Sequence, residues 1–395
     1  MLRRQLPVYS PITLDAVLAG AASALSSGRA RAAREALVAY LSRGFGASDV
    51  LLTDSGTSAL RLAIAGAASL RPALATALPA YCCYDVATAA DGADVPVALY
   101  DLDPRTLAPR PESLERALER GVSSVVVAHL YGQPVDVDAV ARLAGAAGAL
   151  VIEDAAQGIG ATLRGVPLAS FGSVSVLSLG RGKGWTGGSG GALLAHDERG
   201  AAIVARARHA MAPGSRGMAD VARLGAQLLL GQPSLYGLPA SLPFLHLGET
   251  IYRPASEPRA ASRASVGAAW RTCELLERET ELRKANGTRL LAAARASEKV
   301  RVVESVDGAS PGYLRLPVLR GAARGAIGGR AARLGIAAGY PLALCDLAGF
   351  KERVKNRDED FSGARELAAR LATLPTHSRL SQGDIAALEG WLAVG

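Results

Sequence analysis

Lysine is scarce in this chain. Of its 395 residues 44 are basic, but only five of these are lysine, and four of the five (Lys284, Lys299, Lys351 and Lys355) lie near the C-terminal end. Lys183 is therefore the only lysine in the first 283 residues. Arginine supplies charge equally well, but it keeps its proton near neutral pH and cannot form a Schiff base. The lone lysine suggests amine chemistry, and a solvated loop lysine is the simpler alternative.

Cysteine and histidine are scarce too, with four and five residues. The cysteines Cys82, Cys83, Cys273 and Cys345 have no metal-site spacing, and the adjacent pair cannot readily form a disulfide. The histidines form no HxxxH or HxH pattern, which argues against a zinc enzyme and predicts no metal. This cysteine usage predicts a reducing, cytoplasmic location, and the N-terminus has no long apolar stretch typical of a signal peptide.

Dense basic runs are absent as well, although the net charge is +8. The arginines are spread through expected helices without interleaved aromatic residues, so no nucleic-acid partner is expected. An anionic small-molecule substrate remains compatible with this charge.

Short apolar runs alternate with helical patterns from about residue 50. The runs lie at 50–52, 95–99, 125–130, 150–152, 174–177 and 192–195, and helical patterns lie at 59–68 and 137–147. Runs that are apolar throughout predict strands buried on both faces of a mostly parallel sheet flanked by helices. The length indicates two domains: a large domain over 1–250 and a smaller C-terminal α/β domain over 251–395.

The smaller domain has its own pattern. Residues 264–291 predict one long helix with a charged face, followed by apolar runs at 300–303 and 313–319 and by helices at 323–334 and 363–372.

An apolar insertion at about 209–250 interrupts the large domain. Its central part, 224–248, contains no charged side chain, and Pro233, Pro239 and Pro243 exclude a membrane-spanning helix. It suggests a lid over an apolar substrate or a peripheral membrane contact. A buried insertion or a dimer contact is the simpler alternative.

Three apolar runs end in polar groups, at residues 54–57, at Glu153-Asp154 and at Ser178. Parallel sheets bind ligands at the carboxyl ends of their strands. Gly56, Thr57 and Ser58 open a helix whose N-terminal N–H groups favour a phosphate, although they also suit an ordinary helix cap. The Ser178 hydroxyl can join this phosphate site.

Asp154 and Lys183 extend the pattern. A carboxylate that faces a pyridine nitrogen keeps it protonated and makes the ring an electron sink, and the small residues Ala155 and Ala156 leave room for a flat ring. A buried aspartate that caps the next turn is the alternative. Lys183 follows Ser178 by five residues, in a glycine-rich turn able to bring its amine to such a ring.

Together these segments resemble the DegT/DnrJ/StrS-type family of fold-type-I enzymes that depend on pyridoxal 5'-phosphate, mostly aminotransferases acting on nucleotide-linked keto sugars. The resemblance covers nearly the whole chain. Its segments are residues 55–60 (Ser-Gly-Thr-Ser-Ala-Leu), 78–81 (Leu-Pro-Ala-Tyr), 97–103, 129–136 (His-Leu-Tyr-Gly-Gln-Pro-Val-Asp), 153–161 (Glu-Asp-Ala-Ala-Gln-Gly-Ile-Gly-Ala), 190–192 and 374–377 (Leu-Pro-Thr-His).

The resemblance implies a role for each matching residue. Lys183 carries the cofactor as a Schiff base and moves a proton, and Asp154 faces the pyridine nitrogen. Gln157 lies near the phenolic oxygen of the ring, and Ala156 packs on one face. Gly56, Thr57, Ser58 and Ser178 hold the phosphate. The family also implies a homodimer with shared sites, an amino acid donor such as glutamate, and a keto-sugar acceptor in polysaccharide or secondary-metabolite biosynthesis.

The chain departs from the family in three places. Where the family often has Ser-Phe-x-x-x-Lys-Asn around its lysine, residues 178–184 here read Ser-Leu-Gly-Arg-Gly-Lys-Gly. Where many members stack an aromatic residue on the ring, the alignment offers Cys83, with Tyr81 and Tyr84 nearby. The segment Gly-x-Asn-x-Arg, through which a partner subunit reaches the phosphate, is missing, and Arg253 is a candidate substitute. Three alternatives remain: a non-sugar or lipid-linked acceptor, a regulatory protein without catalysis, and a dehydratase. The family's dehydratases replace the lysine with histidine, which argues against the last.

Overall fold

The computed structural model describes residues 3–240, 250–321 and 327–394. Its larger sheet has seven strands in the order β1-β9-β8-β5-β4-β2-β3. β9 runs antiparallel to both neighbours, and the other neighbouring pairs are parallel, which confirms the predicted mostly parallel sheet. The strands are β1 (Asp49–Thr53), β2 (Ala75–Pro79), β3 (Val97–Tyr100), β4 (Val122–Ala128), β5 (Leu150–Asp154), β8 (Val174–Ser178) and β9 (Gly191–Ala195).

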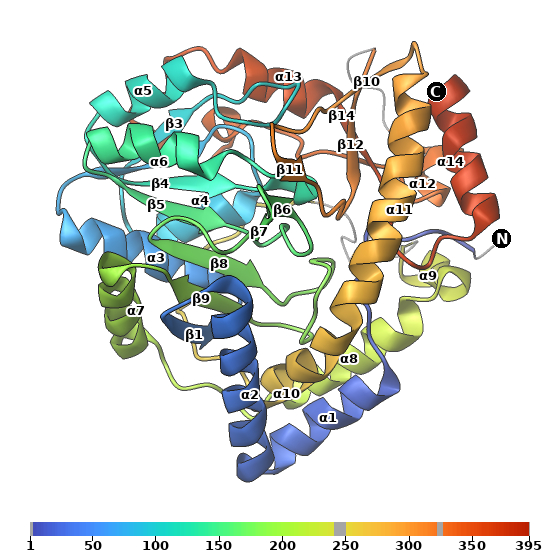
Figure 1. The fold of residues 1–395 in the computed structure, drawn as a ribbon, viewed down its shortest axis with the longest axis horizontal. Coiled ribbons are helices and arrows are strands. Elements are labelled where there is room, and N and C mark those ends of the chain that lie inside the picture. The colour runs from blue at the N-terminus through green and yellow to red at the C-terminus, as the bar shows by residue number, and fades with distance from the viewer. Residues whose placement is uncertain (1–2, 241–249, 322–326, 395) are drawn as a thin grey trace.

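Helices cover both faces of this sheet (Figure 1). Alternate residues of one strand enter different cores: Leu51 packs in the core of α3 and α7, whereas Leu52 packs in the core of α2 and α10. This alternation follows from the two-residue period of a strand. The helices of this part are α1 (Leu14–Leu25), α2 (Ser27–Phe45), α3 (Gly56–Leu70), α4 (Tyr84–Gly92), α5 (Pro111–Glu119), α6 (Val137–Ala146) and α7 (Glu198–Ala210), with a 3-10 turn η1 (Leu130–Gly132).

The long helix predicted over 264–291 is wrong in one respect, because a 3-10 turn divides it. α10 (Arg263–Thr272) and α11 (Leu276–Arg295) flank η3 (Cys273–Leu275). The Thr272 hydroxyl lies 2.7 Å from the carbonyl of Thr186 and 3.2 Å from that of Ala269, and such side-chain bonds compete with the regular helical ladder. α10 packs with α1 and α2, and α11 continues to the second sheet (Figure 1).

The second sheet is antiparallel, in the order β10-β12-β14-β13. Its elements are β10 (Val300–Val302), β12 (Leu316–Arg320), β13 (Ala337–Ala338), β14 (Leu371–Leu374), α12 (Gly329–Arg333), α13 (Ser362–Arg370), α14 (Gln382–Val394), η4 (Leu344–Asp346) and η5 (Lys351–Arg353). A three-stranded sheet joins β11 (Ala309–Ser310) to β6 (Thr162–Leu163) and β7 (Val166–Pro167). The boundary near residue 250 stays a prediction.

Two predicted helices of this part need correction. The helix expected over 363–372 ends at Arg370, because Leu371 and Ala372 pair with Leu319 and Val318 in β14 and β12. Of the helix expected over 323–334, residues 323–326 lie outside the described part, and α12 covers Gly329–Arg333.

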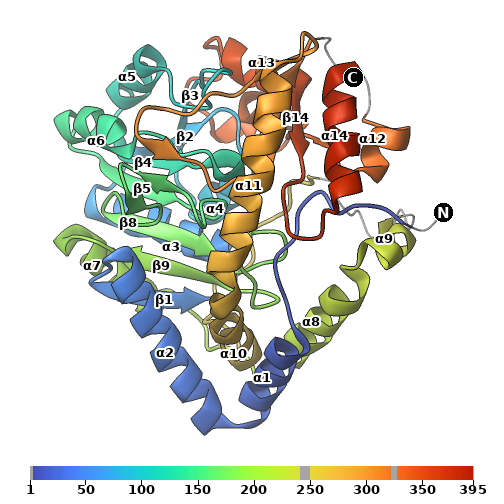
Figure 2. The same ribbon diagram turned by 45° about the vertical axis from the view of Figure 1, so that its right-hand side comes forward.

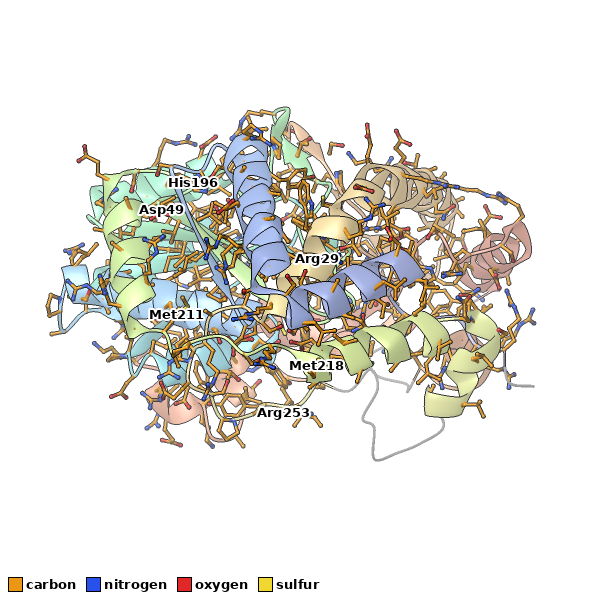
Figure 3. All side chains as sticks on the ribbon, turned by 90° about the horizontal axis from the view of Figure 1, so that it is seen from below. Arg29, Asp49, His196, Met211, Met218 and Arg253 are labelled. Atoms are coloured by element: carbon orange, nitrogen blue, oxygen red, sulfur yellow. The ribbon has the colours of Figure 1, made fainter. Side chains whose placement is uncertain are left out.

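The apolar insertion contains α8 (Met218–Leu230) and α9 (Pro233–Ala240), and residues 241–249 of it lie outside the described part. α8 packs on α1 and α10, with Leu224 fully buried. Met218 and Leu229 are instead 56% and 64% exposed, and Figure 3 shows Met218 on the underside, at the start of α8. Within the described ranges, no helix combines the length and apolar character that crossing a membrane requires.

Candidate active site

The β1–α3 junction lies against the end of β8. A Cβ built on Gly56 would come 2.8 Å from the Ser178 Cβ, so only glycine allows this approach. Ser55 caps α3 by accepting the Ser58 N–H at 3.0 Å, and its hydroxyl reaches the Ser58 hydroxyl at 3.0 Å. The structure therefore brings Gly56 and Ser178 together, and Thr57 follows Gly56 in the first turn of α3, while the Ser58 N–H is already used by the cap.

Asp154 ends β5 on the same edge of the sheet. Its Oδ1 accepts the Ala156 N–H at 3.0 Å, and its side chain lines a small cavity with Cys83 and Gln157. Burial raises the pKa of Asp154, against the opposing effects of the Ala156 N–H and of the charge at Lys183. A cationic ring nitrogen beside the carboxylate would counter the burial, because it favours the ionised form.

A buried pair supports this strand end. The Val135 N–H donates to His129 Nδ1 at 3.0 Å, so Nε2 carries the proton and donates to Glu153 Oε1 at 3.0 Å. Glu153 also accepts the N–H groups of Ala169 and Phe171, at 2.7 and 2.8 Å. Both carboxylate oxygens of Glu153 therefore accept hydrogen bonds from the protein itself. The sequence did not predict this role for Glu153.

Gln157 is held between two tyrosines. Its Oε1 accepts the Tyr131 N–H at 3.1 Å, and its Nε2 donates to the Tyr340 hydroxyl at 2.8 Å. Tyr340 stacks on Tyr131 with ring centroids 5.7 Å apart, and its N–H donates to the Tyr81 hydroxyl at 2.9 Å. Burial raises the pKa of Tyr340 well above its usual value, so its phenol stays protonated. Sequence reasoning missed Tyr340, which lies 183 residues away from Gln157.

Of the three residues named for the stacking position, Cys83, Tyr81 and Tyr84, Cys83 is the one that lines the cavity. Burial, with the nearby Asp85 carboxylate, raises the pKa of its thiol to about 12, so the group is a neutral thiol at physiological pH. Tyr81 and Tyr84 instead use their hydroxyls on Tyr340 and on the Leu342 N–H, the latter at 2.9 Å.

Lys183 lies half-buried in the loop after β8. Its charge lowers the pKa of both Asp154 and Cys83, against the larger effect of burial, which places it within electrostatic reach of the cavity. The Lys183 N–H donates to the Ser10 hydroxyl at 3.1 Å, and the Arg283 guanidinium donates to the Gly184 carbonyl at 3.2 Å. Neither partner was predicted, and no local motif marks them.

Arg253, the candidate substitute for a partner residue, lies away from this cavity in its own chain. It is exposed, its carbonyl accepts the Thr88 hydroxyl at 2.9 Å, and Figure 3 shows it on the underside. Its role across a dimer stays a prediction.

The donor set suits pyridoxal 5'-phosphate. The N-terminus of α3 with Gly56 and Ser178 forms a close cradle suited to a phosphate, and Asp154 Oδ2 makes no hydrogen bond to the described residues. The cavity at Asp154 measures only about 10 Å³, so its lining has to rearrange before a ring can enter.

The fold and this grouping define an α/β protein of the predicted fold-type-I class. The sequence profile of the DegT/DnrJ/EryC1/StrS aminotransferase family matches residues 20–226, more than half of the chain, and the chain belongs to this family.

Individual relatives agree over shorter stretches. The chain is 30% identical over 190 residues to an L-glutamine:2-deoxy-scyllo-inosose aminotransferase of Streptomyces fradiae, a match covering 48% of this chain and 40% of that protein. The chain therefore spans less than half the length of this curated relative.

Solved structures agree over the whole chain. AtS13 from Actinomadura melliaura has a TM-score of 0.75 at 19% identity, covering 100% of this chain and 99% of that one. The dehydratase ColD, solved as a mutant with bound GDP-perosamine, has a TM-score of 0.71 at 16% identity, covering 98% of this chain and 100% of that one. These likenesses confirm the predicted fold class, and since aminotransferase and dehydratase share the fold, the reaction has to be argued from the site.

Proposed function

We propose that this protein is a pyridoxal-phosphate-dependent aminotransferase that moves an amino group from an amino acid to a keto sugar. The observation that carries the proposal is Lys183: the single lysine of the N-terminal two-thirds lies in the loop beside Ser178, where its charge acts on Asp154. Family membership supports the same reading.

Each residue then has a defined task. Gly56, Thr57 and Ser178 bind the phosphate at the N-terminus of α3, with a smaller part for Ser58. Asp154 Oδ2 would face the pyridine nitrogen, Gln157 would lie near the phenolic oxygen, and Ala156 and Cys83 would flank the ring. The cofactor would supply the electron sink. The Lys183 amine would bind the cofactor and, when free, would hold and return the proton of the substrate carbon.

The donor and acceptor follow from the family. The sequence predicts glutamate as donor, whereas the Streptomyces relative is named for L-glutamine, so both belong in the first assay. The proposed acceptor is a nucleotide-linked keto sugar of polysaccharide or secondary-metabolite biosynthesis. The ColD structure contains a GDP-linked sugar in the same fold, which supports a nucleotide-linked acceptor.

A lipid-linked acceptor is the second candidate. The exposed Met218, Leu229 and Leu238 of α8 and α9 favour it, because an apolar surface can contact a lipid chain or a membrane. The same surface could instead form the contact of a homodimer, which is the assembly we propose. The proposed location is the cytoplasm. A vesicle partition assay tests the membrane contact: a protein that never associates with anionic vesicles has no peripheral membrane contact.

Absorption spectroscopy tests the reaction. The purified protein titrated with pyridoxal phosphate should develop a visible band, which Lys183→Ala abolishes and which glutamate or glutamine bleaches. A wild-type protein that binds no cofactor at saturation contradicts the proposal and favours the regulatory alternative.

A further inference from the structure

The Lys183 loop has little regular structure of its own. Gly182 and Gly184 have φ angles of 75° and 81°, in the left-handed region that glycine enters most easily. The loop is closed by the Gly187 N–H, which donates to the Leu179 carbonyl at 2.9 Å, but this bond does not involve residue 183. An amine that has to stay in one place therefore needs support from elsewhere in the fold.

Ser10 supplies that support on one side. Its hydroxyl oxygen accepts the N–H groups of Lys183 and Gly184, both at 3.1 Å. Ser10 is only 6% exposed, so water cannot readily replace it as the acceptor. Val8 packs on the same loop, since a Cβ on Gly182 would lie 2.8 Å from Val8 Cγ1.

Arg283 of α11 supports the opposite side. Its Nη2 donates to the Gly184 carbonyl at 3.2 Å, and its side chain is fully buried. The Gly184 residue is therefore held through its N–H by Ser10 and through its carbonyl by Arg283. The nearest carboxylate, Glu279, lies 3.4 Å from Arg283 Nε.

The segment that carries Ser10 is itself fixed by C-terminal residues. The Gln5 side chain donates to Asp384 at 2.8 Å, and His377 Nε2 donates to the Leu6 carbonyl at 2.9 Å. The Tyr9 hydroxyl accepts from Arg379 at 3.1 Å. Figure 2 shows this N-terminal segment passing α14 before it reaches α1. Ser10 is thus a hydrogen-bond acceptor on a segment that is held in place by contacts with the C-terminal part of the chain.

We propose that Ser10 is a positioning residue for the Lys183 amine, so that the N-terminal segment forms part of the active site. Its consequence for catalysis rests on the proposed function, whereas the hydrogen bonds themselves belong to the polypeptide without cofactor. Ser10 does not line the cavity at Asp154, and it acts through the backbone N–H groups of the loop.

The test compares Ser10→Ala, Ser10→Thr and the matched control Ser26→Ala. Ser26 also accepts a backbone N–H, from Arg29 at 3.3 Å, but it caps α2 on the surface. In the cofactor-free protein, hydrogen exchange at the Lys183 and Gly184 amides should become at least tenfold faster in Ser10→Ala, as expected for the loss of a buried hydrogen bond. Ser10→Thr should restore the wild-type rate, and Ser26→Ala should not change it.

Cofactor titration provides the second readout. The Kd for pyridoxal phosphate should rise about tenfold in Ser10→Ala, and the pH midpoint of the visible band should shift, because the amine is less well placed. A purely structural Ser10 would lower thermal stability and leave the affinity and the pH midpoint unchanged, which overturns the proposal.

If Ser10→Ala does not fold, hydrogen exchange is measured in the wild-type protein and in Ser10→Thr. Rapid exchange at the Lys183 and Gly184 amides of the wild type overturns the proposal. Slow exchange at both amides that is kept in Ser10→Thr supports it. A wild-type protein that binds no cofactor refutes the proposed function and with it the positioning role, whatever the exchange rates show.

Discussion

Asp154 and Lys183 belong to the same candidate site, but different kinds of structure hold them. Asp154 ends a central strand that pairs with β4 on one side and β8 on the other. Lys183 lies in a loop whose amide depends on Ser10, 173 residues earlier in the chain. The sheet edge therefore builds half of the site from local strand and helix ends, and long-range hydrogen bonds build the other half.

This difference has an energetic consequence. Changes that add volume at the sheet edge strain a rigid layer and should lower stability together with binding. Changes at the lysine loop should alter chemistry more than stability, because the loop contributes little to the core.

The largest expected effect is at the loop itself. Lys183→Ala should lower kcat by about a thousandfold or more, because no other amine can carry the proton, while the melting temperature stays near that of the wild type. Lys351→Ala is the matched control in steady-state assays. A Lys183→Ala protein with more than a tenth of wild-type kcat contradicts the assignment.

Asp154→Asn should lower kcat by about a hundredfold, since the amide cannot hold the ring nitrogen protonated. The amide oxygen can still accept the Ala156 N–H, and burial already disfavours the charged carboxyl, so the free energy of unfolding should not fall. The exposed Asp138→Asn is the control. Equal activity of the two variants would remove Asp154 from the mechanism.

Acid should loosen the anchor of the N-terminal segment. Burial lowers the pKa of His377 to about 4 from 6.5, so the unfolded chain binds more protons between these values. The contribution of the neutral His377 to the free energy of unfolding is therefore fully present above about pH 6.5. It falls by about 3 kcal/mol as the pH drops to 4, at 1.36 kcal/mol per pKa unit.

Chemical denaturation at several pH values measures this loss. His377→Gln should flatten the slope between pH 6.5 and 4, and the exposed His209→Gln should keep it. An unchanged slope in His377→Gln means that other groups cause the acid sensitivity.

The smallest expected effect is at Gly56. Gly56→Ala places a methyl group against Ser178 and should cost about 1–3 kcal/mol of the free energy of unfolding, with weaker cofactor binding. Gly145→Ala in α6, where a Cβ meets nothing within 4 Å, should instead stabilise by about 0.4–1 kcal/mol. A Gly56→Ala protein as stable as Gly145→Ala contradicts the close approach.

The same division explains what the sequence predicted. The runs at 50–52, 150–152 and 174–177 identified β1, β5 and β8, because buried parallel strands are apolar throughout and end at one edge. The same pattern predicts Gly56, Asp154 and Ser178 at one edge of the sheet, where the structure also has them. Their roles toward a cofactor stay predictions.

The remaining features have no local signal. Ser10 is one serine before a proline, Arg283 is one arginine among many, and Tyr340 reaches Gln157 from 183 residues further along the chain. The break of the predicted long helix depends on a hydroxyl of Thr272 that bonds Thr186. Such contacts depend on tertiary packing, which periodicity and turn signals do not record.

Borohydride reduction of the protein with pyridoxal phosphate, followed by peptide mass spectrometry, shows which lysine binds the cofactor. The chain has only five lysines, so the labelled position can be read without ambiguity. We expect one phosphopyridoxyl group, on Lys183. A label on another lysine, or none at saturating cofactor, would contradict this expectation.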